Sequence, residues 1–195
     1  MKIPYYDQNA GEFFDRTVEI DVSEIRNAFL EYLPDGGSIL DAGCGSGRDT
    51  KAFINAGYLV QAFDVSTRMS QLASEFTGVE VIERSFLDYG SKTQFDGIWA
   101  CASLLHVPRD ELFLTIQHLA KWLRVGGFFY ASFKQGQTER FTDGRYFNDM
   151  DDSQFDELLS GSELLEPEIS WITIDGRLKE RERWFNTISR RIDTK

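Results

Sequence analysis

A short apolar segment followed by three closely spaced glycines most constrains the fold of this chain. Ile39-Leu40-Asp41 is the apolar segment, and Gly43, Gly45 and Gly47 follow it at alternate positions. The segment suits a buried strand that ends on an acid, and a helix is expected directly afterwards, over residues 48–55. A strand, a glycine turn and a helix in this order predict one strand–helix unit of a parallel sheet.

The rest of the chain alternates between helical and apolar segments in the same way. The spacing of apolar residues predicts helices over 21–33, 48–55, 66–76, 108–123 and 151–160, and strands over 38–41, 58–64, 79–82, 95–100, 128–133, 169–174 and 183–189. Because parallel strands need crossover connections, this order predicts a mostly parallel sheet. The last two strands are joined at a tight turn, Asp175-Gly176, so they should run antiparallel to each other. Residues 134–150 are polar and are expected to form a loop.

The composition narrows the class of protein. The chain has 195 residues, a formal charge of −11 and 42% hydrophobic residues, which fits one folded domain and argues against a general attraction to nucleic acid or anionic lipid. No apolar run reaches the roughly 20 residues that span a bilayer, and the first residues lack the apolar core of a signal peptide. Cys44 and Cys101 are too few for a disulfide framework, and no cluster has metal-ligand spacing. We therefore expect a soluble cytoplasmic protein with no metal and no membrane or nucleic-acid partner.

The glycine turn also predicts a ligand site. Without Cβ atoms the backbone can approach a ligand closely, and the first N–H groups of the next helix are free to donate. A dinucleotide-binding loop needs its third glycine where this chain has Arg48, and no lysine follows Gly47 as a P-loop requires. Asp64 ends the next strand, 21 residues beyond Gly43, the usual place for an acid that binds both ribose hydroxyls. A nucleoside without a pyrophosphate fits these observations; the alternative is a plain turn, with Asp64 capping the next helix.

These segments resemble class I S-adenosylmethionine-dependent methyltransferases over nearly the whole chain. Asp41–Gly47 is similar to the first motif of that family, Asp64 matches its ribose-binding acid, and Leu123–Gly127 resembles the segment before its fifth strand, where proline is more usual than Val125. The resemblance implies an α/β Rossmann-like three-layer fold with helices on both faces. Its sheet would have seven strands in the order 3-2-1-4-5-7-6, with strand 7 antiparallel.

A narrower resemblance is to small bacterial methyltransferases related to tellurite resistance. It rests on Gly47-Arg48-Asp49, on residues 99–108 and on the tail with Trp184 and Asn186. The family resemblance implies methyl transfer from S-adenosylmethionine to a small-molecule acceptor, with S-adenosylhomocysteine as product, by a monomer or homodimer. A base-methylating Asn/Asp-Pro-Pro-Tyr/Phe motif is absent, because residues 100–103 read Ala-Cys-Ala-Ser. The alternatives are a non-catalytic S-adenosylmethionine-binding module and a nicotinamide-dependent oxidoreductase.

The resemblance also implies which residues hold the cofactor. Its methionine part would lie against Gly43, Gly45 and the N-terminal segment, with Asp41 accepting from the ammonium. Arg48 would pair either with the ligand's carboxylate or with a nearby acid. The expected cofactor-binding residues are Tyr6, Phe14, Asp41, Gly43, Cys44, Gly45, Gly47, Arg48, Asp64, Val65, Met69, Ser85, Phe86, Cys101 and Ala102.

The adenine end leaves two assignments open. Many relatives have an acid at the end of the third strand that receives the adenine amino group. Here Ser85 replaces that acid, with the Phe86 backbone touching the ring, or Asp88 supplies it. Val65 and Met69 would flank the adenine, although Met69 is equally suited to the core.

Three further features concern the acceptor side. Residues 1–20 are expected to form a lid in which Tyr6 and Phe14 close the site, unless they are a simple packing helix. His106 is the best-placed candidate for a general base, and its alternative role is to hold the turn before Pro108. The loop over 134–150 would shape the acceptor pocket, with candidate contacts from Arg140, Arg145 and Tyr146.

Overall fold

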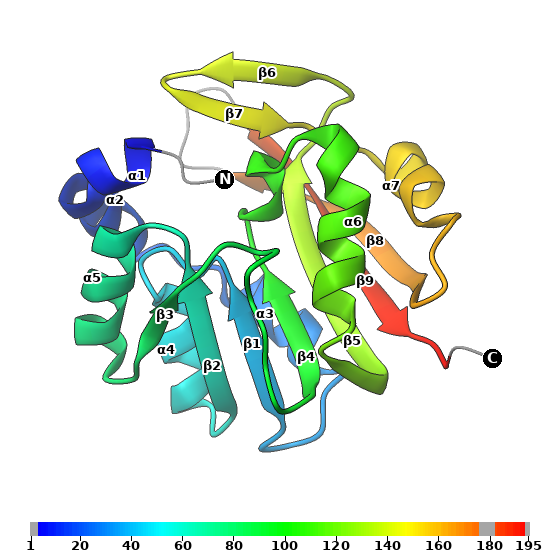
Figure 1. Cartoon of the computed structure of the whole chain (residues 1–195), viewed down its shortest axis with the longest axis horizontal. Helices are drawn as coiled ribbons and strands as arrows, with labels where there is room; N and C mark the ends of the chain where they lie inside the picture. The colour runs from blue at the N-terminus through cyan, green and yellow to red at the C-terminus, as the bar shows by residue number, and fades with distance from the viewer. Residues whose placement is uncertain (1–3, 176–181, 194–195) are drawn as a thin grey trace.

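The computed structural model describes residues 4–175 and 182–193, and its centre is a seven-stranded sheet in the order β3-β2-β1-β4-β5-β9-β8 (Figure 1). The strands of this sheet are β1 Ser38–Ala42, β2 Leu59–Asp64, β3 Val81–Glu83, β4 Phe95–Ala100, β5 Leu123–Lys134, β8 Leu165–Asp175 and β9 Glu182–Arg191. The first five are parallel to one another, and β9 runs antiparallel to both β5 and β8. Counted within the sheet alone, β8 and β9 are its sixth and seventh strands, so the predicted order 3-2-1-4-5-7-6 with an antiparallel seventh strand is confirmed.

Helices cover both faces of the sheet (Figure 1). They are α1 Pro4–Gln8, α2 Ala10–Thr17, α3 Ser23–Leu30, α4 Arg48–Asn55, α5 Thr67–Thr77, α6 Arg109–Ala120 and α7 Asp152–Leu159, with a 3₁₀ turn, η1, at Leu104–His106. The predicted bounds of α4 and β4 agree with the structure residue for residue. The helix expected over 108–123 ends at Ala120, because Leu123 already pairs with Phe95 as the start of β5.

The sheet is buried on both sides, as alternate residues of one strand show. In β4, Ile98 packs into the apolar cluster beneath α6 and α7, whereas Trp99 packs into the cluster beneath α3 and α4. The Trp99 ring stacks on Tyr130 with centroids 3.9 Å apart, and its indole N–H donates to Asp49 at 3.0 Å. The central strands are therefore fixed on both faces, which holds their carboxyl ends in place.

The expectation of a loop over 134–150 was wrong. Two strands, β6 Glu139–Thr142 and β7 Arg145–Asn148, pair as an antiparallel hairpin that stands beyond the carboxyl ends of β4 and β5 (Figure 1). Asp143 and Gly144 both have positive φ, 51° and 72°, as a two-residue hairpin turn of type I′ requires. The Asp-Gly pair was the sequence signal, and the polar side chains around it obscured the strands.

The N-terminal segment lies against α5. Asp7 accepts hydrogen bonds from the Ser66 hydroxyl at 2.7 Å and the Arg68 backbone N–H at 3.2 Å, so α1 supplies a carboxylate to the start of that helix. Phe14 of α2 packs edge-on against Phe76 of α5.

The predicted antiparallel pairing of the last two strands is confirmed, with Asp175 opposite Glu182; Gly176 of the expected turn lies outside the described residues.

Strand order reverses between β1 and β4, because β1 pairs with β2 on one side and with β4 on the other. In open parallel sheets a crevice forms outside the carboxyl ends of the strands at such a point. The loops after β1, β2 and β4 open here, and α1, α2 and the β6–β7 hairpin lie around them.

Candidate functional site

Two adjoining cavities occupy this edge of the sheet. The first, of about 210 Å³, lies between the loops after β1, β2, β3 and β4. The second, of about 950 Å³, lies between the N-terminal segment, the ends of β5, β8 and β9, and the hairpin. The two cavities adjoin, because the residues that line both are Tyr6, Phe13, Thr17, Arg48, Cys101, Ala102 and His106.

The glycines after β1 serve two different purposes. A Cβ on Gly43 would lie 2.7 Å from Cβ of Ser103, and the Ser103 hydroxyl donates to the Ala42 carbonyl at 2.7 Å, so Gly43 is required by packing between loops. A Cβ on Gly45 would meet nothing nearer than Phe13 at 3.8 Å. The space over Gly45 belongs to the first cavity, which leaves its backbone accessible to a ligand.

Asp64 closes the opposite side of that space. Its carboxylate accepts the backbone N–H groups of Gly45 and Ser66, each at 2.9 Å. Burial raises the pKa of Asp64 above its ordinary value, although those two N–H groups oppose the shift. The carboxylate is thus held rigidly by backbone at the end of β2, facing the first cavity.

Asp41 lies deeper, at the end of β1. It is buried, and Oδ2 accepts the Thr50 hydroxyl at 2.6 Å. Burial, and then the nearby charge of Asp49, raise the pKa of Asp41 to about 8. A carboxyl group so short of partners favours a cationic ligand group, because a cation would stabilise its charged form.

Arg48, considered as a partner either for the ligand's carboxylate or for a nearby acid, pairs with Asp49 in this structure. Its guanidinium makes two hydrogen bonds to Asp49, at 3.0 and 2.7 Å, and Arg26 adds a third at 2.9 Å. Although burial alone would raise it, these arginines keep the pKa of Asp49 below its ordinary value. Arg48 still lines both cavities, so its outer edge remains available to a ligand.

At the far end of the first cavity the walls are apolar. Val65, Met69, Ser85 and Phe86 all line it, and Met69 is also a core residue with 1% exposure. Asp88 does not line the cavity; it accepts the Ser85 hydroxyl at 2.6 Å. The geometry therefore brings Ser85 and Phe86, rather than Asp88, to this end of the cavity.

The loop after β4 forms the floor between the two cavities. Ala102 has a φ of 50°, and its N–H donates to the Ser132 hydroxyl at 2.9 Å. Cys101 lies beside it, and burial raises the pKa of its thiol to about 11, so the thiol is neutral. Burial also raises the pKa of the Cys44 thiol. Both cysteines act here as small walls rather than as nucleophiles.

The predicted cofactor residues come together, with two exceptions. Gly47 is not on the cavity wall; its Cβ position is filled by Thr77 at 2.8 Å, so it serves packing against α5. Phe14 points to Phe76, and its neighbour Phe13 lines both cavities instead. Those that line the first cavity are Tyr6, Asp41, Gly43, Cys44, Gly45, Arg48, Asp64, Val65, Met69, Ser85, Phe86, Cys101 and Ala102.

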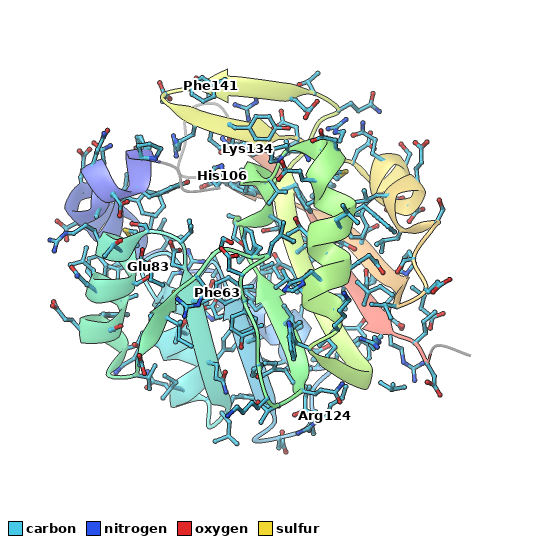
Figure 2. The ribbon with its side chains drawn as sticks, viewed as in Figure 1. Phe63, Glu83, His106, Arg124, Lys134 and Phe141 are labelled. Carbon is cyan, nitrogen blue, oxygen red and sulfur yellow. The ribbon has the colours of Figure 1, made fainter. Side chains whose placement is uncertain are left out.

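His106 links the N-terminal segment to the hairpin (Figure 2). Its Nδ1 lies 2.7 Å from the Tyr146 carbonyl oxygen, and its Nε2 lies 2.6 Å from the Tyr6 hydroxyl. A carbonyl only accepts, so Nδ1 carries the proton and Nε2 is the acceptor. Burial lowers the pKa of His106 to about 4, so the ring is neutral at neutral pH and Nε2 accepts the Tyr6 hydroxyl.

The hairpin residues divide by whether their side chains reach the second cavity. Arg145 lines the second cavity. Arg140 makes two hydrogen bonds to Asp149, at 2.9 and 3.1 Å, and the Tyr146 hydroxyl donates to Glu139, so neither side chain reaches the cavity. Sequence reasoning missed Lys134, Ser132 and Asn186 as walls, because β5 and β9 meet there only through the sheet order.

The described part of the chain holds no cluster of three or more metal-ligating side chains, and none of its helices is long and apolar enough to cross a membrane. The two cavities are lined by backbone, carboxylates, arginine and lysine side chains, one neutral imidazole and aromatic rings.

Comparison with known proteins identifies a matching family and related structures. Residues 39–127 match the family model described as "Methyltransferase domain". A curated relative, (S)-coclaurine N-methyltransferase of Papaver somniferum, is 25% identical over 135 residues, 63% of this chain; the chain spans only 38% of the length of that enzyme.

Solved structures share the fold over almost the whole chain. One is the 1,6-didemethyltoxoflavin-N1-methyltransferase of Burkholderia thailandensis with bound 1,6-didemethyltoxoflavin and S-adenosylhomocysteine: TM-score 0.74, 23% identity, 98% of this chain and 85% of that one. Another is the magnesium protoporphyrin IX methyltransferase of Synechocystis PCC 6803 with bound S-adenosylmethionine: TM-score 0.72, 17% identity, 95% of this chain and 94% of that one.

Proposed function

We propose that this chain, whose residues 39–127 match the methyltransferase-domain family model, transfers a methyl group from S-adenosylmethionine to a small-molecule acceptor. The observation that carries the proposal is the open space over Gly45, faced by the backbone-held carboxylate of Asp64. That pair suits a ribose, because the carboxylate can accept from both sugar hydroxyls.

The other residues of the first cavity fit the remainder of S-adenosylmethionine. Asp41 would receive the ammonium of its methionine part, and Val65, Met69 and Phe86 would enclose its adenine. Cys101 and Ala102 would lie at the sulfonium. Their side chains are uncharged and would not pair with its positive charge. The turn does not match a diphosphate-binding loop, because it has neither the lysine of a P-loop nor the third glycine of a dinucleotide-binding motif.

When bound, S-adenosylmethionine would supply the methyl group and keep the electron pair of the broken carbon–sulfur bond as S-adenosylhomocysteine. This chain's residues would position the acceptor and exclude water, with Tyr6 and Phe13 lying over the cavities. As the acceptor atom bonds to the methyl carbon, its proton would pass to the Tyr6 hydroxyl oxygen while that hydroxyl gives its own proton to Nε2 of His106, whose tautomer the Tyr146 carbonyl fixes.

The setting that we propose is the cytoplasm, with a monomer or homodimer acting on metabolites rather than on nucleic acid and without a metal ion. The formal charge of −11 supports a metabolite rather than nucleic acid as the acceptor, because the chain would repel a polyanionic substrate. The resemblance of residues 99–108 to methyltransferases related to tellurite resistance adds chalcogen oxyanions to the acceptors worth testing.

Calorimetry with S-adenosylmethionine and S-adenosylhomocysteine tests the proposal first. We expect both to bind, and NADH not to. Transfer of tritium from methyl-labelled S-adenosylmethionine to a metabolite extract then tests for catalysis. No binding at millimolar ligand would refute the proposal, and binding without any transfer would identify a cofactor-binding module.

A further inference from the structure

The second cavity contains a cation that the fold does not neutralise. Nε of Arg145 is buried and has no hydrogen-bond partner, and the ion pairs among the described residues do not include this arginine. Its guanidinium lies 4.4 Å over the Tyr5 ring and 5.1 Å from the centroid of Phe147, so aromatic faces hold it in place.

The other cations of the cavity differ from Arg145. Lys134 pairs with Glu182 and Arg48 pairs with Asp49. Arg16 is exposed to solvent on α2, where water screens its charge. Among the described residues that line this cavity, Arg145 is therefore the half-buried cation that has no carboxylate as an ion-pair partner.

The carboxylates of the cavity do not offset it. Glu19 and Asp21 line the cavity from the connection between α2 and α3, Glu24 lines it from α3, and all three are exposed. Asp175 and Glu182 line it from β8 and β9; Glu182 pairs with Lys134, and neither forms an ion pair with Arg145 among the described residues. Asp21 is already held by the Ser23 backbone N–H at 2.8 Å. Charges in water interact weakly across a cavity, whereas a half-buried guanidinium gains strongly from an anion.

The position of Arg145 relates this charge to the reacting atoms. Its positive charge opposes the rise that burial causes in the pKa of Tyr6, which places it beside that hydroxyl. Tyr6 in turn lies 2.6 Å from Nε2 of His106. An acceptor bound to Arg145 would thus extend past Tyr6 toward His106, between rings of Phe13, Phe147 and Trp184.

We infer that the acceptor is an organic acid with an apolar, ring-sized body, whose carboxylate pairs with Arg145 and whose N–H or O–H faces the Tyr6 hydroxyl that is bonded to His106. This inference rests on the proposed function, since it takes the second cavity as the acceptor site. Arg145 offers parallel N–H groups to both oxygens of a carboxylate, and the aromatic walls offer nothing to a small hydrated ion.

The experiment titrates the S-adenosylhomocysteine-loaded full chain with three carboxylates: benzoate, phenylacetate and indole-3-acetate. Each is compared with its neutral carboxamide, and benzylamine and selenite serve as a cationic and an inorganic anionic probe. We expect at least one carboxylate to bind, at least tenfold more tightly than its carboxamide and more tightly than selenite.

Two matched variants on the hairpin assign the effect. Arg145→Gln should weaken the carboxylate at least tenfold and leave affinity for S-adenosylhomocysteine within twofold. Arg140→Gln removes the same charge from β6, where Asp149 holds it outside the cavity, and should leave carboxylate binding unchanged. Melting temperatures of both variants report whether the hairpin is intact.

Several results would overturn the inference: no carboxylate binds, a carboxamide or benzylamine binds equally well, selenite binds more tightly, or Arg145→Gln retains full affinity. If instead the wild-type chain fails to bind S-adenosylhomocysteine, the proposed function itself fails. The two failures are therefore distinguishable in one set of titrations.

Discussion

The first and second cavities are built in different ways. The first is formed by loops of consecutive strand–helix units, and its key contacts come from backbone: the Gly45 N–H on Asp64, and the close approach of Gly43 to Ser103. The second is closed by segments far apart in the chain, α1, η1, β7 and β9, joined through side chains such as Tyr6 and His106. A backbone-built site tolerates little change of residue, whereas a side-chain-built site can change its ligand without changing the fold.

The largest contrast is expected between two glycines with similar φ. Gly43→Ala adds a Cβ 2.7 Å from Cβ of Ser103 at a φ of 76°. The steric overlap and the backbone strain together should lower the free energy of unfolding by about 3–5 kcal/mol. Gly144→Ala, in the hairpin turn at a φ of 72°, meets nothing within 4 Å and should cost about 1–2 kcal/mol. Thermal unfolding measures both; equal losses would mean that the first cavity is not the more tightly constrained.

Ionisation of the buried Asp41 carboxyl should lower the free energy of unfolding as the pH rises. Its pKa is raised from the ordinary value to about 8, so the folded state binds more protons than the unfolded state between about pH 4 and 8. Stability from this group is then fully present below about pH 4 and declines by at most about 1.4 kcal/mol per pH unit up to pH 8. Asp41→Asn should raise the melting temperature at pH 8.5 more than at pH 5, while weakening S-adenosylhomocysteine binding. An equal rise at both values would contradict the shift.

Asp64→Ala should weaken S-adenosylhomocysteine by about 1–3 kcal/mol, the scale of a lost charged hydrogen bond. Asp88→Ala is the matched control, because its carboxylate contacts Ser85 outside the first cavity. We expect its affinity by calorimetry to stay within twofold of wild type. If Asp88→Ala causes the larger loss, the adenine end has been assigned to the wrong residue.

The smallest effect is expected at the link between the two cavities. Tyr6→Phe removes the hydroxyl that lies 2.6 Å from His106, and should lower stability by about 0.5–1.5 kcal/mol. Tyr5→Phe keeps the ring beside Arg145 and should leave the melting temperature unchanged. Identical melting curves for both variants would show that the Tyr6–His106 contact does not hold α1 in place.

The difference between the cavities also explains what the sequence could predict. The alternation of strands and helices, the glycine turn from Gly43 to Gly47 and the acid at the end of β2 followed from local signals. The sheet order and the other residues of the first cavity followed from the family resemblance that these signals carry. Each signal lies within one strand–helix unit, so its meaning does not depend on distant residues. The hairpin at Asp143-Gly144 had such a signal, which was overlooked.

The second cavity could not be assembled from sequence in the same way. Phe13 rather than Phe14 faces inward because α2 packs Phe14 on Phe76, a rotation set by contact with α5. Arg145 and Arg140 lie on the same face of the hairpin, but only Arg145 lines the second cavity, because Asp149 holds Arg140 away from it. These orientations depend on tertiary packing and leave no local pattern.

The position of Tyr6 on both cavity walls has a kinetic consequence. On the proposed function, S-adenosylmethionine in the first cavity would be covered by Tyr6 of α1, while the acceptor in the second cavity would exchange past the hairpin. We therefore expect ordered turnover, with S-adenosylmethionine arriving first and S-adenosylhomocysteine departing last. Inhibition by S-adenosylhomocysteine would then be competitive with respect to S-adenosylmethionine and noncompetitive with respect to the methyl acceptor.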